Sequence, residues 1–126
     1  MELTINGVVY EFKASFKFLR EADKRAKGDK SDGKNVGLKM LLGGLMDGSA
    51  QDLLDTLDLL NAGQDPRVTR SDLEAYLEDE NTDADALFDE VLDFLEKTNA
   101  TKNTVKNIRR DIAKAEQMEA AKNAEK

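Results

Sequence analysis

The segment Leu3-Thr4-Ile5-Asn6-Gly7-Val8-Val9-Tyr10-Glu11-Phe12 decides the class of the fold. Asn-Gly accepts the positive φ angles of a tight type I′ turn, so this segment predicts a β-hairpin with strands over residues 3–5 and 8–12. Both strands alternate with period two, and each offers one apolar face for burial: Leu3 and Ile5 in the first strand, and Val8, Tyr10 and Phe12 in the second. Because two strands alone are only marginally stable, the hairpin must pack on helices or join a larger sheet.

The rest of the chain predicts helices, because apolar residues recur every three or four positions between capping residues. The predicted helices cover residues 15–27, 35–46, 50–61 after the cap Ser49, a short helix opened by the capping box Ser71-Asp72-Leu73-Glu74, 83–97 after the cap Thr82, and about 103–124. The predicted fold class is therefore α+β, mainly α: an N-terminal β-hairpin followed by about five or six helices, the last extended and partly free. We expect residues 1–98 to form a globular helical domain, and residues 99–126 a charged amphipathic helix or tail.

The 126 residues include no His, no Cys and no Trp, which excludes most familiar site chemistry. A zinc finger, a haem or iron–sulfur site, a cysteine nucleophile and a Ser-His-Asp triad all need His or Cys. We expect no metal site and no cofactor, although chemistry built on carboxylates, lysine and a hard metal remains open. No apolar run approaches the roughly 18 residues of a membrane span, and the N-terminus has no secretory-signal pattern.

Charge is distributed unevenly along the chain, whose formal net charge is −7. Residues 35–98 hold 4 basic and 16 acidic residues, a net charge of −12, between two mildly basic ends. One face of the helix predicted over 83–97 carries an acidic stripe of Asp85, Asp89, Asp93 and Glu96. This stripe is either a solvated helix face or a docking surface, for a basic partner or for the chain's own basic stripe of Lys17, Arg20, Lys24 and Lys27.

Two further motifs resemble ion-binding or phosphate-binding loops but lack an essential residue. The acidic series Asp79, Asn81, Asp83 and Asp85 has no glycine at the sixth position of a calcium loop, and we interpret it as an acidic helix start. The stretch from Gly28 to Lys34 approaches the phosphate-loop pattern, but Asn35 stands where Ser or Thr would bind magnesium. Neither motif predicts a ligand site.

Two apolar segments are candidates for contact with a partner. The first is a Leu/Met-rich helix segment, which is either core or an adaptable partner surface: Met40, Leu41, Leu42, Leu45 and Met46. The second is the thin stripe Val105, Ile108 and Ile112 in the last helix, which has too few apolar positions to bury a long helix. This helix is either a partly docked tail or an amphipathic helix that recognises a helical partner.

An ordered set of segments resembles the tail assembly chaperones of long-tailed bacteriophages and prophages of Gram-positive hosts. These segments are Ile5-Asn6-Gly7-Val8-Val9-Tyr10-Glu11-Phe12-Lys13, Phe18-Leu19-Arg20-Glu21-Ala22-Asp23-Lys24, Val36-Gly37-Leu38-Lys39-Met40, the Leu-rich helix over 53–60, Thr69-Arg70-Ser71-Asp72-Leu73-Glu74-Ala75-Tyr76-Leu77 and Leu87-Phe88-Asp89-Glu90-Val91-Leu92.

The resemblance implies a non-enzymatic protein of the host cytoplasm that is absent from the mature virion. Its implied partners are the tape measure protein, which it keeps soluble, and the major tail (tube) protein, which it recruits through a longer form made by ribosomal frameshifting. Self-association is possible, and neither nucleic acid nor a membrane is implied as a partner. The family supplies no catalytic or partner-binding residues to transfer. The alternatives are an acidic nucleic-acid mimic or regulator that binds a basic partner, and a magnesium-dependent carboxylate enzyme.

Overall fold

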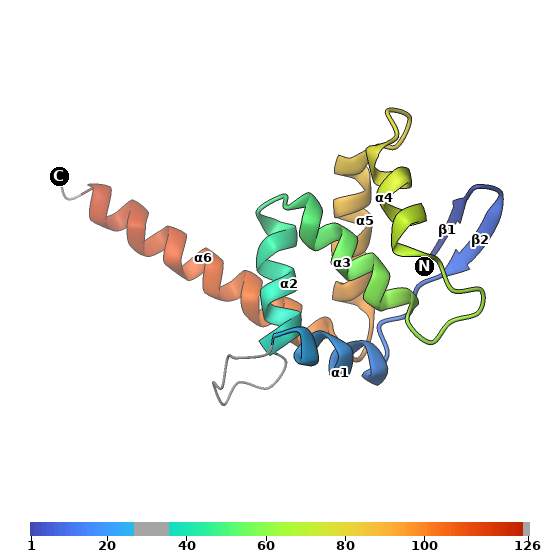
Figure 1. Ribbon diagram of the computed structural model, residues 1–126. Coiled ribbons are helices and arrows are strands. Elements are labelled where there is room, and N and C mark those ends of the chain that lie inside the picture. The colour runs from blue at the N-terminus through green and yellow to red at the C-terminus, as the bar shows by residue number, and fades with distance from the viewer. Residues whose placement is uncertain (27–35, 125–126) are drawn as a thin grey trace.

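The computed structural model describes residues 1–26 and 36–124. A two-stranded antiparallel hairpin is followed in the described ranges by six helices (Figure 1). The elements are β1 (Glu2–Ile5), β2 (Val8–Glu11), α1 (Phe16–Arg25), α2 (Val36–Met46), α3 (Ala50–Asn61), α4 (Arg70–Glu78), α5 (Ala84–Lys97) and α6 (Lys102–Ala124). This architecture confirms the predicted α+β, mainly α, class.

The hairpin forms with the predicted turn. Asn6 and Gly7 have φ angles of 52° and 77°, as a type I′ turn requires. Leu3 pairs with Tyr10 across the strands, and both side chains are buried. The prediction that Val8 is buried was wrong: Val8 is 40% exposed, although Ile5, its partner across the strands, is buried. The difference arises because the hairpin contacts α4 through β1, which carries Ile5.

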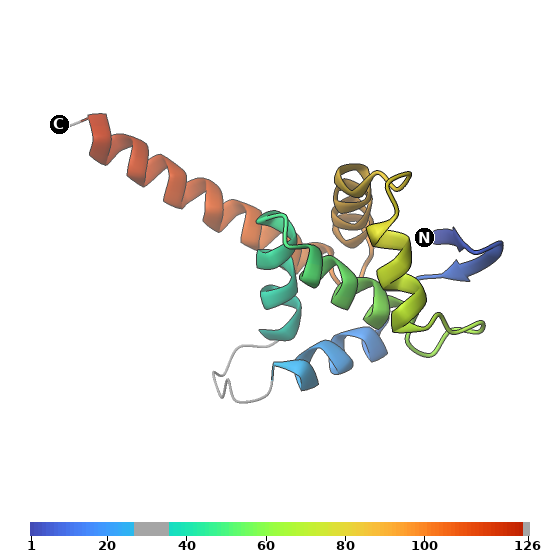
Figure 2. The same cartoon turned by 45° about the horizontal axis from the view of Figure 1, so that its top comes forward.

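Helices α2 and α3 form the centre of the core. Their leucines are buried together with Phe12 and Phe18 from the chain before them; the fully buried set includes Leu38, Leu42, Leu53, Leu57 and Leu60. Helix α1 packs on both α2 and α3, α4 packs on α3, and α5 and α6 pack on α2 (Figure 2). The hairpin lies against α4 through β1.

Glycine allows α1 and α2 to approach each other closely. A Cβ atom at Gly37 would lie 2.1 Å from the backbone oxygen of Ala22, which is far inside van der Waals contact. The backbone N–H of Gly37 also donates to the carboxylate of Asp23, at 3.0 Å, so α1 satisfies a free amide in the first turn of α2.

Two helices begin at caps other than the predicted ones. Thr69 rather than Ser71 caps α4, and its hydroxyl accepts a hydrogen bond from the Asp72 N–H. This shift arises because Val68 is buried and its N–H donates to Asn61, which fixes the backbone direction just before Thr69. Asp83 rather than Thr82 caps α5; the Thr82 hydroxyl instead donates to the Tyr76 carbonyl. The predicted cap Ser49 is confirmed.

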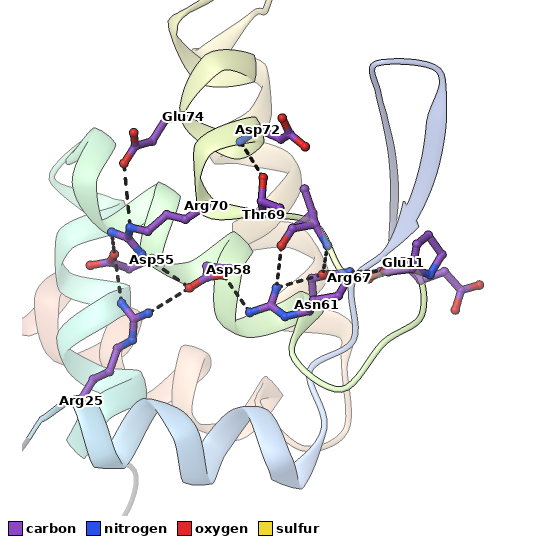
Figure 3. Close-up of polar contacts among 12 residues, drawn as sticks. Glu11, Arg25, Asp55, Asp58, Asn61, Arg67, Thr69, Arg70, Asp72 and Glu74 are labelled. Atoms are coloured by element: carbon purple, nitrogen blue, oxygen red, sulfur yellow. Dashed lines mark hydrogen bonds and ion pairs between the residues drawn. The ribbon is translucent and has the colours of Figure 1, made fainter.

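A buried amide organises the loop after α3 (Figure 3). The Asn61 side chain donates to the carbonyl of Glu11 in β2 and accepts from the Val68 N–H and the Arg67 guanidinium. It is fully buried and satisfied on both its oxygen and its nitrogen. This single side chain therefore ties the hairpin, the end of α3 and the approach to α4 together.

Arginines from three segments surround two carboxylates of α3 beside that amide (Figure 3). Asp58 forms ion pairs with Arg25 at 3.0 Å, Arg67 at 2.8 Å and Arg70 at 3.5 Å. Asp55 accepts from Arg70, and this hydrogen bond raises the pKa of the Arg70 guanidinium. The cluster links α1, α3 and α4 at the border of the core.

Two glycines of α2 provide a matched test of this packing. We expect Gly37→Ala to lower the free energy of unfolding by about 1–3 kcal/mol, because its Cβ collides with the backbone of α1. Gly43 is exposed, and a Cβ atom added there would meet no other atom within 4 Å, so Gly43→Ala should raise that free energy by about 0.5–1 kcal/mol. Urea denaturation followed by circular dichroism measures both; equal effects would contradict the close helix contact.

Candidate functional site

Helix α6 begins at the body of the protein, and its C-terminal part projects away from the other helices (Figures 1 and 2). Near its start, Val105 is fully buried, and the buried hydroxyl of Thr101 donates to the Leu95 carbonyl in α5. Ile108 is half-buried, Ile112 is 40% exposed, and residues 113–122 are all exposed. The first turns of α6 are thus part of the core, whereas its second half is open to solvent.

The apolar stripe of α6 continues past the end of the packed region. Val105, Ile108 and Ile112 follow the spacing of one helix face, and Ala115 continues that face. A second exposed apolar side chain, Met118, is 74% exposed in the free half. The sequence pattern missed Met118 because it lies beside the stripe rather than on it. The same face that holds α6 to the body is therefore uncovered beyond it.

Most of the predicted surface on α2 lies in the core. Leu41, Leu42 and Leu45 are 7%, 0% and 2% exposed, because this face of α2 packs against α1, α3, α5 and α6. Met46 is half-buried, and Met40 is 58% exposed. Because these three leucines and Val105 are buried, a partner of the folded chain cannot contact their side chains. Partner binding by the remaining residues stays a prediction.

The acidic stripe borders an open groove between α5 and α6, with a volume of about 560 Å³. Asp89, Asp93 and Glu96 line it together with Ala86, Glu90, Leu92 and Arg109. Asp93 pairs with Lys97 at 2.9 Å and raises the pKa of that ammonium group, and Glu96 pairs with Arg109 at 3.7 Å. Asp85 is exposed near the start of α5, and it forms no ion pair with another described residue.

The described residues of the chain's own basic stripe form no ion pair with this groove. Lys17, Arg20 and Lys24 are exposed on α1, whereas Lys27 lies outside the described residues. Lys24 pairs with Glu21 on its own helix. Between α1 and α5, no ion pair forms among the residues that the structure describes. Pairing of the two stripes, one of the alternatives for the acidic stripe, therefore does not occur within the described part of one chain.

Of the calcium-loop-like and phosphate-loop-like motifs, the structure describes only the first. The carboxylates of Asp79 and Asp83 accept backbone N–H groups of Asn81 and Ala86, as turn and cap residues do. In the described ranges 1–26 and 36–124, no group of three His, Cys, Asp or Glu side chains could hold a metal ion. The phosphate-loop-like stretch from Gly28 to Lys34 lies outside the described residues. No described helix is both long enough and apolar enough to cross a membrane.

Comparison with known protein families identifies one family model that matches most of the chain. The family model described as "Phage tail assembly chaperone protein, TAC" matches residues 2–110, which include the hairpin, α1 to α5 and the packed start of α6. No curated protein and no solved structure matches the chain. The matched region ends close to the point where α6 becomes exposed.

The division of α6 into a packed start and a free half can be tested by two variants. Deleting residues 113–126 should change the free energy of unfolding by less than about 0.5 kcal/mol, because exposed positions contribute little. Val105→Ala should lower it by about 1–3 kcal/mol, since it leaves a cavity in the core. Thermal and urea denaturation measure both, and a large loss of stability in the deletion variant would show that the free half packs on the body.

Proposed function

Because the chain belongs to the phage tail assembly chaperone family, we propose that it binds the tape measure protein during tail assembly and keeps that protein soluble. The observation that supports this proposal most directly is the apolar stripe of α6, which continues uncovered beyond the body at Ile112. A helical partner can lie along this stripe and cover it, as amphipathic helices cover each other in other complexes.

The size of the free surface suits reversible binding. Helix α6 has 23 residues and is therefore about 34 Å long at 1.5 Å per residue. Fully burying an exposed side chain of the size of Ile112 yields about 1.5–3 kcal/mol. Ile112 is only 40% exposed, so covering it yields less, and one copy binds weakly. A long helical tape measure chain presents many similar stripes, and several copies bound along it together would shield it. Weak individual contacts also allow each copy of the chaperone to leave as assembly proceeds.

The charge of the chain supports solubility of such a complex. The formal net charge is −7, and the acidic residues of α5 lie on the side of the groove beside α6. A partner helix on α6 would thus be bordered by like-charged, strongly hydrated side chains. Charge of one sign keeps complexes apart and opposes aggregation through the apolar surfaces that remain.

We further propose that a frameshifted longer form recruits the major tail (tube) protein, that both forms act in the host cytoplasm, and that neither enters the mature virion. The arrangement of α6 favours this division of labour. Its C-terminal end projects away from the body (Figure 1), so an added segment could hold tube subunits while the body and α6 hold the tape measure protein. The proposed role is non-enzymatic.

A second candidate function is an acidic regulator that binds a basic partner. The acidic groove between α5 and α6 favours it. The two functions differ in their response to salt: binding through charge weakens steeply as salt is added, whereas binding through apolar stripes survives moderate salt.

Co-expression with the tape measure protein encoded downstream tests the first proposal. We expect co-expression of the wild-type chain to raise the soluble yield of the tape measure protein. With the Ile112→Glu variant, the soluble yield should be close to that of the tape measure protein expressed alone. Val9→Glu is the matched control, since Val9 is 51% exposed on β2, away from α6. An unchanged yield with the wild-type chain, or equal loss with both variants, would sink the proposal.

A further inference from the structure

We propose that the helix bound by this chain is amphipathic with a basic flank, and that the acidic groove between α5 and α6 selects that flank. The inference rests on the proposed function, because it assumes that a partner helix lies along the apolar stripe of α6. It assigns the carboxylates of α5 to the same binding event as the stripe, rather than to a separate regulatory function. Asp89 and Asp93 are then specificity-determining residues.

The groove and the apolar stripe meet at Arg109. Arg109 lines the groove. On α6 it directly follows Ile108 and stands one helical turn before Ile112, so its side chain borders the stripe. Ile108 is half-buried and Ile112 is 40% exposed, so the stripe becomes uncovered beside this wall of the groove. A partner helix that covers Ile112 therefore has one flank over the groove.

The α5 wall of the groove carries carboxylates that have no cation of their own. Asp89 and Glu90 are exposed, and neither forms an ion pair with another described residue. The two further carboxylates of this wall already have partners within the chain. Leu92 adds half-buried apolar surface. Lysine and arginine suit this wall, because their aliphatic stems can cover Leu92 while their charged ends reach the carboxylates.

The groove supplies a discrimination that the stripe cannot. Apolar side chains on α6 accept any helix with a matching apolar face, whatever its flanks. A basic flank forms charge pairs with Asp89 and Glu90, whereas an acidic flank brings like charges onto them. Asp89 and Asp93 are four residues apart on α5 and lie on the same helix face. Each exposed pair contributes little by itself, so the selection comes from several pairs along one flank.

Two synthetic helical peptides of equal length test the inference against the full-length chain. Both carry the same isoleucine stripe, and one has lysine along the flank where the other has glutamate. Isothermal titration calorimetry measures the affinity of each. We expect the lysine peptide to bind about tenfold more tightly at about 0.1 M salt, and less than about threefold more tightly at about 0.5 M salt, because screening weakens exposed charge pairs.

A groove variant and a matched control locate the selectivity. The groove variant carries Asp89→Lys with Asp93→Lys. The control carries Glu2→Lys with Asp47→Lys, at two exposed acidic residues that do not line the groove, and it changes the net charge by the same amount. The groove variant should prefer the glutamate peptide, and the control should still prefer the lysine peptide. Equal loss of the preference in both variants would show that net charge selects the peptide, and would overturn the inference.

The Ile112→Glu variant separates this inference from the proposed function. It should bind both peptides more weakly, while circular dichroism shows that its helix content is kept. If the wild-type chain binds both peptides equally and Ile112→Glu weakens both, the stripe binds helices and only the basic flank is refuted. If neither peptide binds the wild-type chain, the stripe is not a helix-binding surface, and the inference and the proposed function both fail.

Discussion

The apolar face formed by the leucines of α2 is the constraint on which the rest of the structure depends. An apolar helix face must be covered, and α1, α3, α5 and α6 cover this one, while Lys39, Met40 and Gly43 stay exposed on the opposite side of α2. The contact with α1 is close enough to exclude a side chain at Gly37. Once this face is covered, its leucines cannot serve as a surface. The exposed large apolar side chains of the described residues lie elsewhere: Val8, Val9, Phe16, Met40, Ile112 and Met118.

Polar groups hold the elements around this core in register. Asn61 joins the hairpin to the loop before α4, and the two carboxylates of α3 gather arginines from three segments. In the described residues, no buried side-chain nitrogen or oxygen lacks a hydrogen-bond partner. The body is thus well satisfied internally, and the surface proposed for partner binding lies outside it, along α6.

This arrangement agrees with membership of a chaperone family. A protein that binds the apolar surface of another chain needs a stable folded body and an apolar element that is not buried in its own core. Here Val105 anchors α6 in the core while Ile112, about two helical turns later, is partly free. The family match extends to residue 110, so it covers the anchor and ends before the exposed half.

Local pattern alone determined the hairpin, its turn and the position of each helix to within a few residues, because Asn-Gly turns, caps and apolar periodicity act between near neighbours. It predicted Ser71 as the cap of α4, and this was wrong: Thr69 is the cap, because the buried Val68 and its hydrogen bond to Asn61, seven residues earlier, fix the backbone there. Nor could it separate core from surface among Leu41, Leu42, Leu45 and Val105, all of which are simply apolar in sequence. Only the tertiary structure decided which faces are covered, because burial depends on neighbours that are distant along the chain.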